Sequence, residues 1–247
     1  MTKYIDKGEL RFSPPSVFNH MQEGIDKIAD KYEGSLYYPV RDFYIAPLLS
    51  TDENGKDVYG KPIKVADEAR QRITNPKVQK VPFHCLYCYN NYPMNAVIGL
   101  DNYDQIVHEF PDYDTAVIIY KPLEFLRLLE QKFELYCNYV KYTDRTPLES
   151  ELDNGIHYLF YKRKIYEEQK EFRIALPKLQ LDQAQNFEFG SLLDVAYCVP
   201  LETLKYGIII ADGEENFQKI KAKCEEKNWG VSDLQHFSDI RDAQKNI

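Results

Sequence analysis

The sequence predicts an α+β fold, and three observations lead to that prediction. Segments with the alternation of a strand outnumber segments with helical periodicity. Few strands alternate singly with helices, so the strand-helix-strand order typical of a doubly wound parallel sheet is rare. The 247 residues, 44% of them apolar, suffice for one large domain with a sizeable core. We therefore expect a single domain over residues 1–247.

The first third of the chain predicts a strand, a helix and a long excursion. Residues 10–13, Leu-Arg-Phe-Ser, alternate between apolar and polar, and the prolines at 14 and 15 stop the strand. Ser16 can cap a helix that continues to Ile28. Residues 50–82 are polar and rich in Gly, Pro, Asn and Lys, which predicts a variable excursion with a helical turn or two near 67–73.

The remaining two thirds predict mainly strands. Alternating or continuous apolar character places strands at residues 81–89, 115–120, 136–142, 171–176, 194–200 and 207–210. Pro122 opens an amphipathic helix whose apolar stripe is Leu123, Leu126, Leu129 and Phe133.

Two further helices are predicted. Residues 155–164 favour a helix, although their aromatic side chains leave a strand open. The charged segment after Asp212 predicts an amphipathic helix to about Lys227, ended by Gly230.

Composition restricts the compartment and the partners. Five scattered cysteines, an odd number, argue against a disulfide framework and for reduced thiols. No apolar run approaches the length of a membrane helix, and the N-terminus lacks the apolar region of a secretory signal. We therefore expect a cytoplasmic protein that neither spans nor binds a membrane. With 31 basic and 39 acidic residues, broad binding of nucleic acid is disfavoured, although a local basic patch could support it.

One strand carries the most informative polar pattern. Alternate residues of a strand share a face, so Gln169, Glu171 and Arg173 lie opposite Phe172 and Ile174. Such a polar triple can be a solvated sheet face. Alternatively, it can line a cleft together with the first strand, where Arg11 and Ser13 share a face.

Three short motifs resemble a large bacterial family of uncharacterised proteins. The opening Leu-Arg-Phe-Ser-Pro-Pro-Ser-Val-Phe-Asn at residues 10–19 resembles the strand, Ser-x-Pro turn and Phe-Asn pair that begin its members. Gln-Lys-Glu-Phe-Arg at residues 169–173 resembles their Glu-x-Glu-aromatic-Arg strand. The aliphatic strand and acidic-capped helix over residues 208–227 resemble their ending.

That family resembles a distant branch of the ADP-ribosyltransferase fold, which occurs in toxins and phage-defence systems. The resemblance implies a split, two-sheet core with peripheral helices, NAD as substrate and no metal. By this analogy Arg11 holds NAD, Glu171 is the catalytic carboxylate and Gln169 positions the acceptor. A carboxylate suits the positive charge that develops on the ribose, and an arginine suits the diphosphate. Glutamine instead of glutamate at position 169 indicates, by the same analogy, an acceptor other than arginine.

The chain departs from this pattern at the expected Ser-Thr-Ser strand. The nearest candidate is residues 84–89, His-Cys-Leu-Tyr-Cys-Tyr, which leaves Ser13 as a substitute for the group that orients Glu171. Either Tyr87 or Tyr89 could stack on nicotinamide. The expected contacts to NAD are therefore Arg11, Ser13, Tyr87 and Tyr89.

The densest basic run suggests where an acceptor could bind. Lys162, Arg163 and Lys164 precede Arg173 and form a candidate landing site for a nucleic-acid or protein acceptor. A solvated face is the alternative.

Other functions also remain open. Glu168 and Lys170 form a Glu-x-Lys tripeptide downstream of Asp153, as in magnesium-dependent nucleases. Cys85 and Cys88 form a Cys-x-x-Cys pair without a second pair, so we expect a structural role and no metal. No glycine-rich phosphate loop occurs. The last alternative is non-catalytic: a binding or regulatory protein on the same scaffold, such as an antitoxin or a phage-encoded inhibitor. For the enzyme, the resemblance also implies an antitoxin or another regulatory protein as partner.

Overall fold

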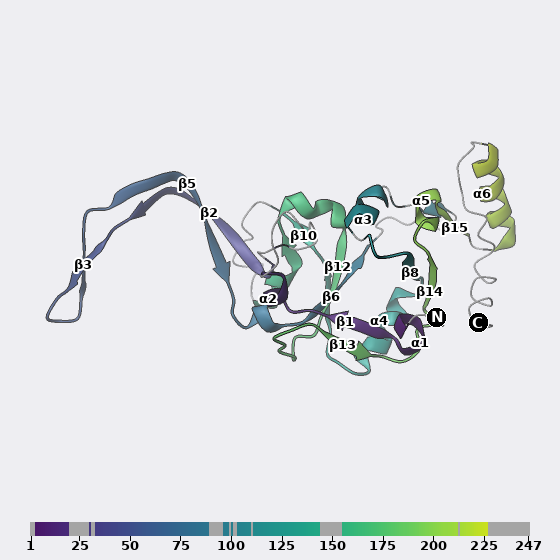
Figure 1. The fold of residues 1–247 in the computed structure, drawn as a ribbon, viewed down its shortest axis with the longest axis horizontal. Coiled ribbons are helices and arrows are strands. Elements are labelled where there is room, and N and C mark those ends of the chain that lie inside the picture. Colours follow the sequence, from purple (N-terminus) through teal and green to yellow (C-terminus); the bar gives the residue numbers. More distant parts are fainter. Residues whose placement is uncertain are drawn as a thin grey trace.

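The computed structural model describes residues 3–19, 30, 33–88, 96–98, 100, 103–109, 111–143, 155–211 and 213–226. Helices and strands both occur and are not arranged as repeated strand-helix-strand units, which confirms the α+β prediction. Figure 1 shows a body built around short strands and a long two-stranded arm that projects from it.

The central sheet of the body has three antiparallel strands. Its order is β6 (Phe83–Tyr87), β12 (Glu171–Ala175) and β9 (Tyr136–Tyr139). A single bridge between Ser13 and Phe83 places the end of β1 (Glu9–Phe12) beside β6. The outer edge of β1 pairs with β13 (Gln185–Glu188). The strand that carries Arg11 therefore reaches the same sheet as the strand that carries Glu171.

The main core lies on one side of this sheet. Phe12 and Ile174 are fully buried there, and Phe125 and Leu129 of helix α4 (Pro122–Glu130) pack into the same cluster. Pro122 opens α4 as predicted, because the first helical turn needs no backbone donor. The predicted apolar stripe is wrong at Leu123, which is 65% exposed; Phe125 takes the buried position.

Smaller strand pairs surround the central sheet. They are β8 (Thr115–Ile119) with β14 (Ala196–Pro200), β7 (Ala96–Ile98) with β15 (Ile208–Ile210), and the parallel pair β10 (Lys141–Tyr142) with β11 (Tyr161–Lys162).

Short helices complete the body. The α-helices besides α4 are α1 (Lys3–Lys7), α2 (Pro15–Phe18), α3 (Tyr103–Glu109), α5 (Thr203–Tyr206) and α6 (Glu214–Glu226). The 3-10 helices are η1 (Val78–Lys80), η3 (Gly155–Phe160) and η4 (Lys164–Gln169). Among the described helices, none has the length and apolar character that a membrane span requires.

The arm consists of residues 35–74, and its structure shows that the prediction for residues 50–82 is partly wrong. Strand β2 (Ser35–Ile45) pairs antiparallel with β5 (Ile63–Thr74), and β3 (Leu48–Thr51) pairs with β4 (Asp57–Tyr59) toward the tip. The helical turn predicted near residues 67–73 is wrong, since these residues lie in β5. Ala, Glu, Arg and Gln favour a helix locally, but pairing with β2, about thirty residues earlier, decides the structure.

Most other predicted elements agree with the structure to within three residues. The single strand predicted over residues 136–142 is wrong, because it is divided into β9 and β10, which pair with different strands. Residues 155–164, predicted as a helix, form a 3-10 helix followed by β11. The helix predicted after Ser16 is seen only as α2. The capping role predicted for Ser16 is wrong, because α2 begins at Pro15 and has no side-chain cap hydrogen bond. The predicted continuation beyond residue 19 lies outside the described residues, as do Gly230 and Tyr89.

Candidate functional site

Strand β12 places Glu171 and Arg173 on the face of the sheet that lies opposite Ile174. Across the sheet, Glu171 pairs with Tyr87, and Arg173 pairs with Cys85. The predicted shared face is therefore present, but it is closed rather than solvated. Arg173 has no exposed surface, and Glu171 is 8% exposed.

Four charged side chains meet on this face and form what we call the ionic cluster: Glu33, Lys162, Glu171 and Arg173. Both terminal nitrogens of Arg173 donate to the carboxylate of Glu33, and Nη2 lies 3.0 Å from Glu33 Oε2. Arg173 Nε donates to Glu171 Oε2 at 2.7 Å. Arg173 also donates to the carbonyl of Leu159. Lys162 Nζ lies 2.6 Å from Glu171 Oε1 and 3.7 Å from Glu33 Oε2. Two positive and two negative charges thus balance inside the protein.

The charged forms of Glu171, Arg173 and Lys162 are stabilised by partners of opposite charge. Burial alone would raise the pKa of Glu171, but Arg173 and Lys162 outweigh it and lower the pKa to about 2. Burial would lower the pKa of Arg173, but Glu171 and Glu33 raise it well above its usual value. The same two carboxylates raise the pKa of Lys162 against the effect of burial. Removing any one member would therefore leave an uncompensated buried charge.

Gln169 reaches the cluster from a different element than predicted. It ends the 3-10 helix η4, and its side-chain oxygen accepts a hydrogen bond from Lys162 Nζ at 2.6 Å. Lys170 adopts a left-handed backbone, with φ of 43°, and turns the chain into β12. Gln169 and Glu171 therefore lie together because both bind the ammonium group of Lys162, and not because they alternate along one strand as predicted.

Cys85 and Tyr142 border Glu171. The Cys85 residue is exposed, but its sulfur faces the cluster and donates to Glu171 Oε2 at 3.3 Å. Burial of this sulfur, and then the charge of Glu171, raise the pKa of the thiol well above its usual value. The hydroxyl oxygen of Tyr142 accepts the backbone N–H of Glu171 at 2.8 Å. Cys85 is therefore a neutral thiol at the boundary between the cluster and solvent.

Arg11 and Ser13, two of the residues expected to bind NAD, lie on or directly after β1, the strand beside β6, and are not members of the ionic cluster. The Arg11 side chain is exposed, and within the described part of the chain no hydrogen bond or ion pair links it to Glu171. Its carbonyl accepts a hydrogen bond from His84 Nδ1 at 2.9 Å. Ser13 pairs with Phe83 through the backbone, and Tyr87 lies beside Glu171 in the register of the sheet. The arginine that meets Glu171 is Arg173.

The predicted acceptor-binding patch is not a surface patch, because two of its members are buried. Lys162 and Arg173 belong to the ionic cluster. Arg163 is partly buried and forms an ion pair with Asp30 at 3.1 Å. Lys164 is exposed. A run of basic residues does not reveal which of them will meet an acidic partner elsewhere in the chain.

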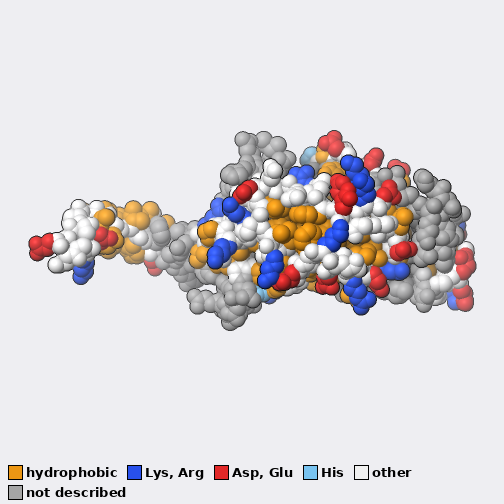
Figure 2. All heavy atoms as spheres, turned by 90° about the horizontal axis from the view of Figure 1, so that it is seen from below, with side chains coloured by type: hydrophobic (Ala, Val, Ile, Leu, Met, Phe, Trp, Pro, Cys, Tyr) orange, Lys and Arg blue, Asp and Glu red, His pale blue; other side chains and the backbone are white. Residues whose placement is uncertain are grey.

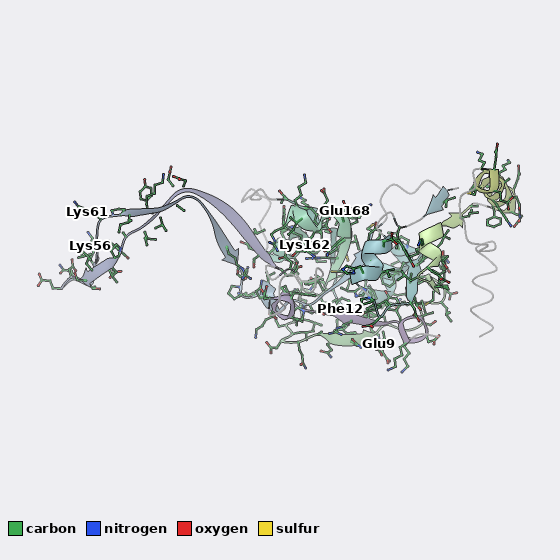
Figure 3. All side chains as sticks on the ribbon, turned by 45° about the horizontal axis from the view of Figure 1, so that its top comes forward. Glu9, Phe12, Lys56, Lys61, Lys162 and Glu168 are labelled. Atoms are coloured by element: carbon green, nitrogen blue, oxygen red, sulfur yellow. The ribbon has the colours of Figure 1, made fainter. Side chains whose placement is uncertain are left out.

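Figure 3 shows Lys162 within the body near Glu168, whereas Lys56 and Lys61 lie far out on the arm. Glu168 is exposed on η4, and Asp153, its partner in the nuclease alternative, lies outside the described residues. Within the described residues, no three His, Cys, Asp or Glu side chains are grouped to hold a metal ion.

Sequence reasoning missed Glu33, although this residue links the cluster to the arm. Glu33 directly precedes Gly34 and the first arm strand, so the ion pair between Arg173 and Glu33 fixes the base of the arm against the sheet. Its signal in the sequence is faint: an acidic side chain beside a glycine just before an aromatic-rich strand.

The base of the arm is further fixed by polar contacts. Gln79 donates to the carbonyls of Glu33 and Gly34 at 3.1 and 2.9 Å. Arg72 donates across the ribbon to Ser35 Oγ at 3.0 Å and to Asn19 Oδ1 of the body at 3.4 Å. These contacts and the ion pair between Glu33 and Arg173 tie both strands of the ribbon to the body, which indicates that the ionic cluster anchors the arm.

Comparison of the chain with family models, with curated proteins and with solved structures finds no match. The functional argument therefore rests on the geometry of the molecule itself.

Proposed function

We propose that the protein is a non-catalytic binding or regulatory protein that presents the arm to a macromolecular partner. The observation that carries this proposal is a group of large apolar side chains on the outer arm, which we call the apolar band. Each of its members is 42 to 65% exposed: Tyr44, Ile45, Leu48, Leu49, Val58, Tyr59, Ile63 and Val65. In Figure 2 these hydrophobic side chains gather between the charged tip and the body. Contiguous exposed apolar surface of this kind marks interaction sites.

The architecture of the arm supports the same conclusion. A two-stranded ribbon gains little stability by itself in water, because neither of its faces is covered. Here the ribbon is nevertheless long, and its base is tied down by the ionic cluster and by Gln79 and Arg72. A long, anchored, apolar ribbon is costly to the free protein, and a partner that covers it would offset this cost.

The charges of the arm indicate which class of partner fits. Residues 44–65 contain three acidic and three basic side chains, so this segment is close to neutral. Nucleic acid would require a clustered basic surface. We infer that the partner is a protein with an apolar surface.

The test compares two triple variants with the same number of exposed apolar side chains removed. The arm variant is Leu48→Ser, Leu49→Ser and Tyr59→Ser. The control replaces three side chains of the body that are 65 to 71% exposed: Tyr113→Ser, Leu123→Ser and Ile165→Ser. Each protein is immobilised, and the proteins it retains from a cell lysate are quantified by mass spectrometry. The wild type and the control should retain the same proteins, and the arm variant should lose them; retention by all three would refute the proposal.

A second candidate function is supported by the state of Glu171. It is an NAD-dependent ADP-ribosyltransferase on a split, two-sheet core, acting as a defence toxin on a nucleic acid or protein. Glu171 is ionised, immobilised by Lys162 and Arg173, and adjoins the exposed residue Cys85. A fixed carboxylate of this kind can stabilise the positive charge that develops on a ribose.

The reaction would need no metal. The bond between ribose C1 and the nicotinamide nitrogen breaks, nicotinamide leaves, and a nucleophilic atom of the acceptor bonds to C1 while its proton passes to solvent. In this candidate, exposed Arg11 of β1 would hold the diphosphate, together with Ser13 directly after the same strand.

Labelled NAD tests this second candidate. Nicotinamide release and label transfer should disappear in Glu171→Gln and also in Arg11→Gln, whose exposed side chain can change without disturbing the core. Glu168→Gln serves as the exposed control. Equal turnover by the Arg11 variant and the wild type, or none by the wild type with several acceptors, would exclude it.

A further inference from the structure

We infer that the partner of the arm is a second copy of this chain, so that two arms pack against each other through their apolar bands. This inference rests on the proposed function, because it assumes that the arm is a binding surface. It adds the identity of the partner.

The exposed area of the band suits a small interface between two copies. Full burial of a large aliphatic side chain removes roughly 100 Å² from water, so half-exposed members offer roughly 50 Å² each, and the two tyrosines offer roughly 100 Å² each. Neighbouring residues of a strand, such as Tyr44 and Ile45, point to opposite faces, so about half of the eight band members lie on one face of the ribbon. One face of each arm therefore provides roughly 200 to 400 Å², which is the size of an apolar interaction patch and suits a weak, concentration-dependent dimer.

The charge distribution permits self-association through the arm and disfavours it elsewhere. In a two-fold symmetric contact each surface meets its own copy, so an excess of one charge sign would cause repulsion. The whole chain carries a net charge of −8, whereas residues 44–65 are balanced at three acidic and three basic side chains. The arm also extends away from the body, which would keep two acidic bodies apart. Beyond about 8 Å their repulsion is largely screened at physiological salt.

The distribution of the band along the arm fits an antiparallel contact between two copies. Leu48 and Tyr59 pair across the ribbon toward its tip, and Ile45 and Ile63 pair nearer the body. If two arms point in opposite directions, the outer pair of one arm meets the inner pair of the other. The reciprocal contact follows from the symmetry.

The tip argues against a lipid partner. Residues 52–57 carry Asp52, Glu53, Lys56 and Asp57, and all are exposed. Inserting these charges into a bilayer is costly, and a tip intended for insertion would be apolar. The apolar band lies behind this charged tip, where it suits contact along the ribbon rather than penetration by its end.

Sedimentation velocity over a concentration series, from nanomolar to tens of micromolar, tests the inference on the full chain. The wild type and the body control should form a dimer. The arm variant should remain monomeric, with dimerisation weakened at least about 100-fold. Circular dichroism and urea unfolding show whether the arm variant keeps a folded body, which it should, since its three side chains touch solvent rather than the core.

Cross-linking of a mixture of ¹⁴N- and ¹⁵N-labelled chains gives a second measurement. Lysine-reactive reagent should join the arm lysines Lys56, Lys61 and Lys64 of one copy to those of the other, seen as mixed-isotope peptides. A wild type that sediments as a monomer throughout, or a dimer that persists in the arm variant, would overturn the inference. If the wild type is monomeric while the arm variant still loses proteins captured from lysate, the proposed function stands with a different partner. If neither measurement responds to the arm, both fail.

Discussion

Replacing Arg173 with methionine tests whether the ionic cluster holds the body and the arm base together. Arg173 is the most buried charge of the cluster and donates to Glu33, to Glu171 and to the carbonyl of Leu159. Methionine has similar length but no donors. The variant would leave two buried carboxylates facing one cation, Lys162.

The expected magnitude follows from that imbalance. Removing one partner of a buried ion pair costs about 3 to 5 kcal/mol, since the remaining charge loses its compensation. For a chain of this size, each kcal/mol lowers the melting temperature by about 2 to 4 °C. We therefore expect Arg173→Met to melt roughly 6 to 20 °C below the wild type. Arg173→Lys, which keeps the charge but loses the two-pronged grip on Glu33, should fall between the two.

Urea unfolding and thermal melting measure these losses, and Lys178→Met is the matched control. Lys178 is 74% exposed and lies 3.8 Å from Glu134, so its loss should change the free energy of unfolding by less than about 0.5 kcal/mol. Adding Glu33→Gln to Arg173→Met restores the balance of charge, so the double variant should lose less than the sum of the single variants. An Arg173→Met protein as stable as the Lys178 control would refute the anchoring role of the cluster.

Three further predictions concern the cluster and the arm base. The pKa of Glu171 is lowered to about 2 in the folded protein, so its ionisation adds about 3 kcal/mol to the free energy of unfolding above pH 4.5. This stabilisation is lost as the pH falls toward 2, and the Glu171→Gln variant should lack this part of the pH dependence in urea unfolding. The charge of Glu171 helps raise the pKa of the Cys85 thiol, so Glu171→Gln should speed the alkylation of Cys85 by iodoacetamide at pH 8. Mass spectrometry measures the rate, and buried Cys224 should stay unlabelled. An unchanged rate at Cys85 would contradict the assigned contact. Gly34 has a φ of +66°, and an added Cβ would lie 2.9 Å from both Gln79 and Pro15. Gly34→Ala should therefore lower the free energy of unfolding, measured by chemical denaturation, by about 2 to 3 kcal/mol, whereas Gly55→Ala at the open tip should lower it by about 1 kcal/mol.

The local patterns of the sequence predicted the positions of the strands β1, β6, β8, β12, β14 and β15 and of the helices α4 and α6, but they missed β7, β13 and the strands of the arm. Alternation in residues 171–176 correctly placed Glu171 and Arg173 on one face, because strand geometry depends only on neighbouring residues. It could not predict burial of that face. The face is closed by Glu33, an acidic partner of Arg173 that lies 140 positions earlier in the chain.

The arm was missed for a related reason. Residues 50–82 are locally polar and contain helix formers, and only pairing with residues 35–45 makes part of them a ribbon. The apolar band gave no usable signal, because exposed apolar residues on a ribbon look like an ordinary strand pattern. Patterns of hydrophobicity predict what is buried in a core, and a surface that is covered only by a partner falls outside that rule.

Hydrogen exchange of the arm tests most directly whether two copies of the chain bind each other through the arm. Exchange is measured by mass spectrometry on the wild type at high concentration, where the dimer forms, and after dilution to the monomer. The account predicts slower exchange in peptides covering residues 44–51 and 57–65 at high concentration, with no change in β12. Arm peptides that exchange equally at both concentrations, or protection confined to the body, would contradict it.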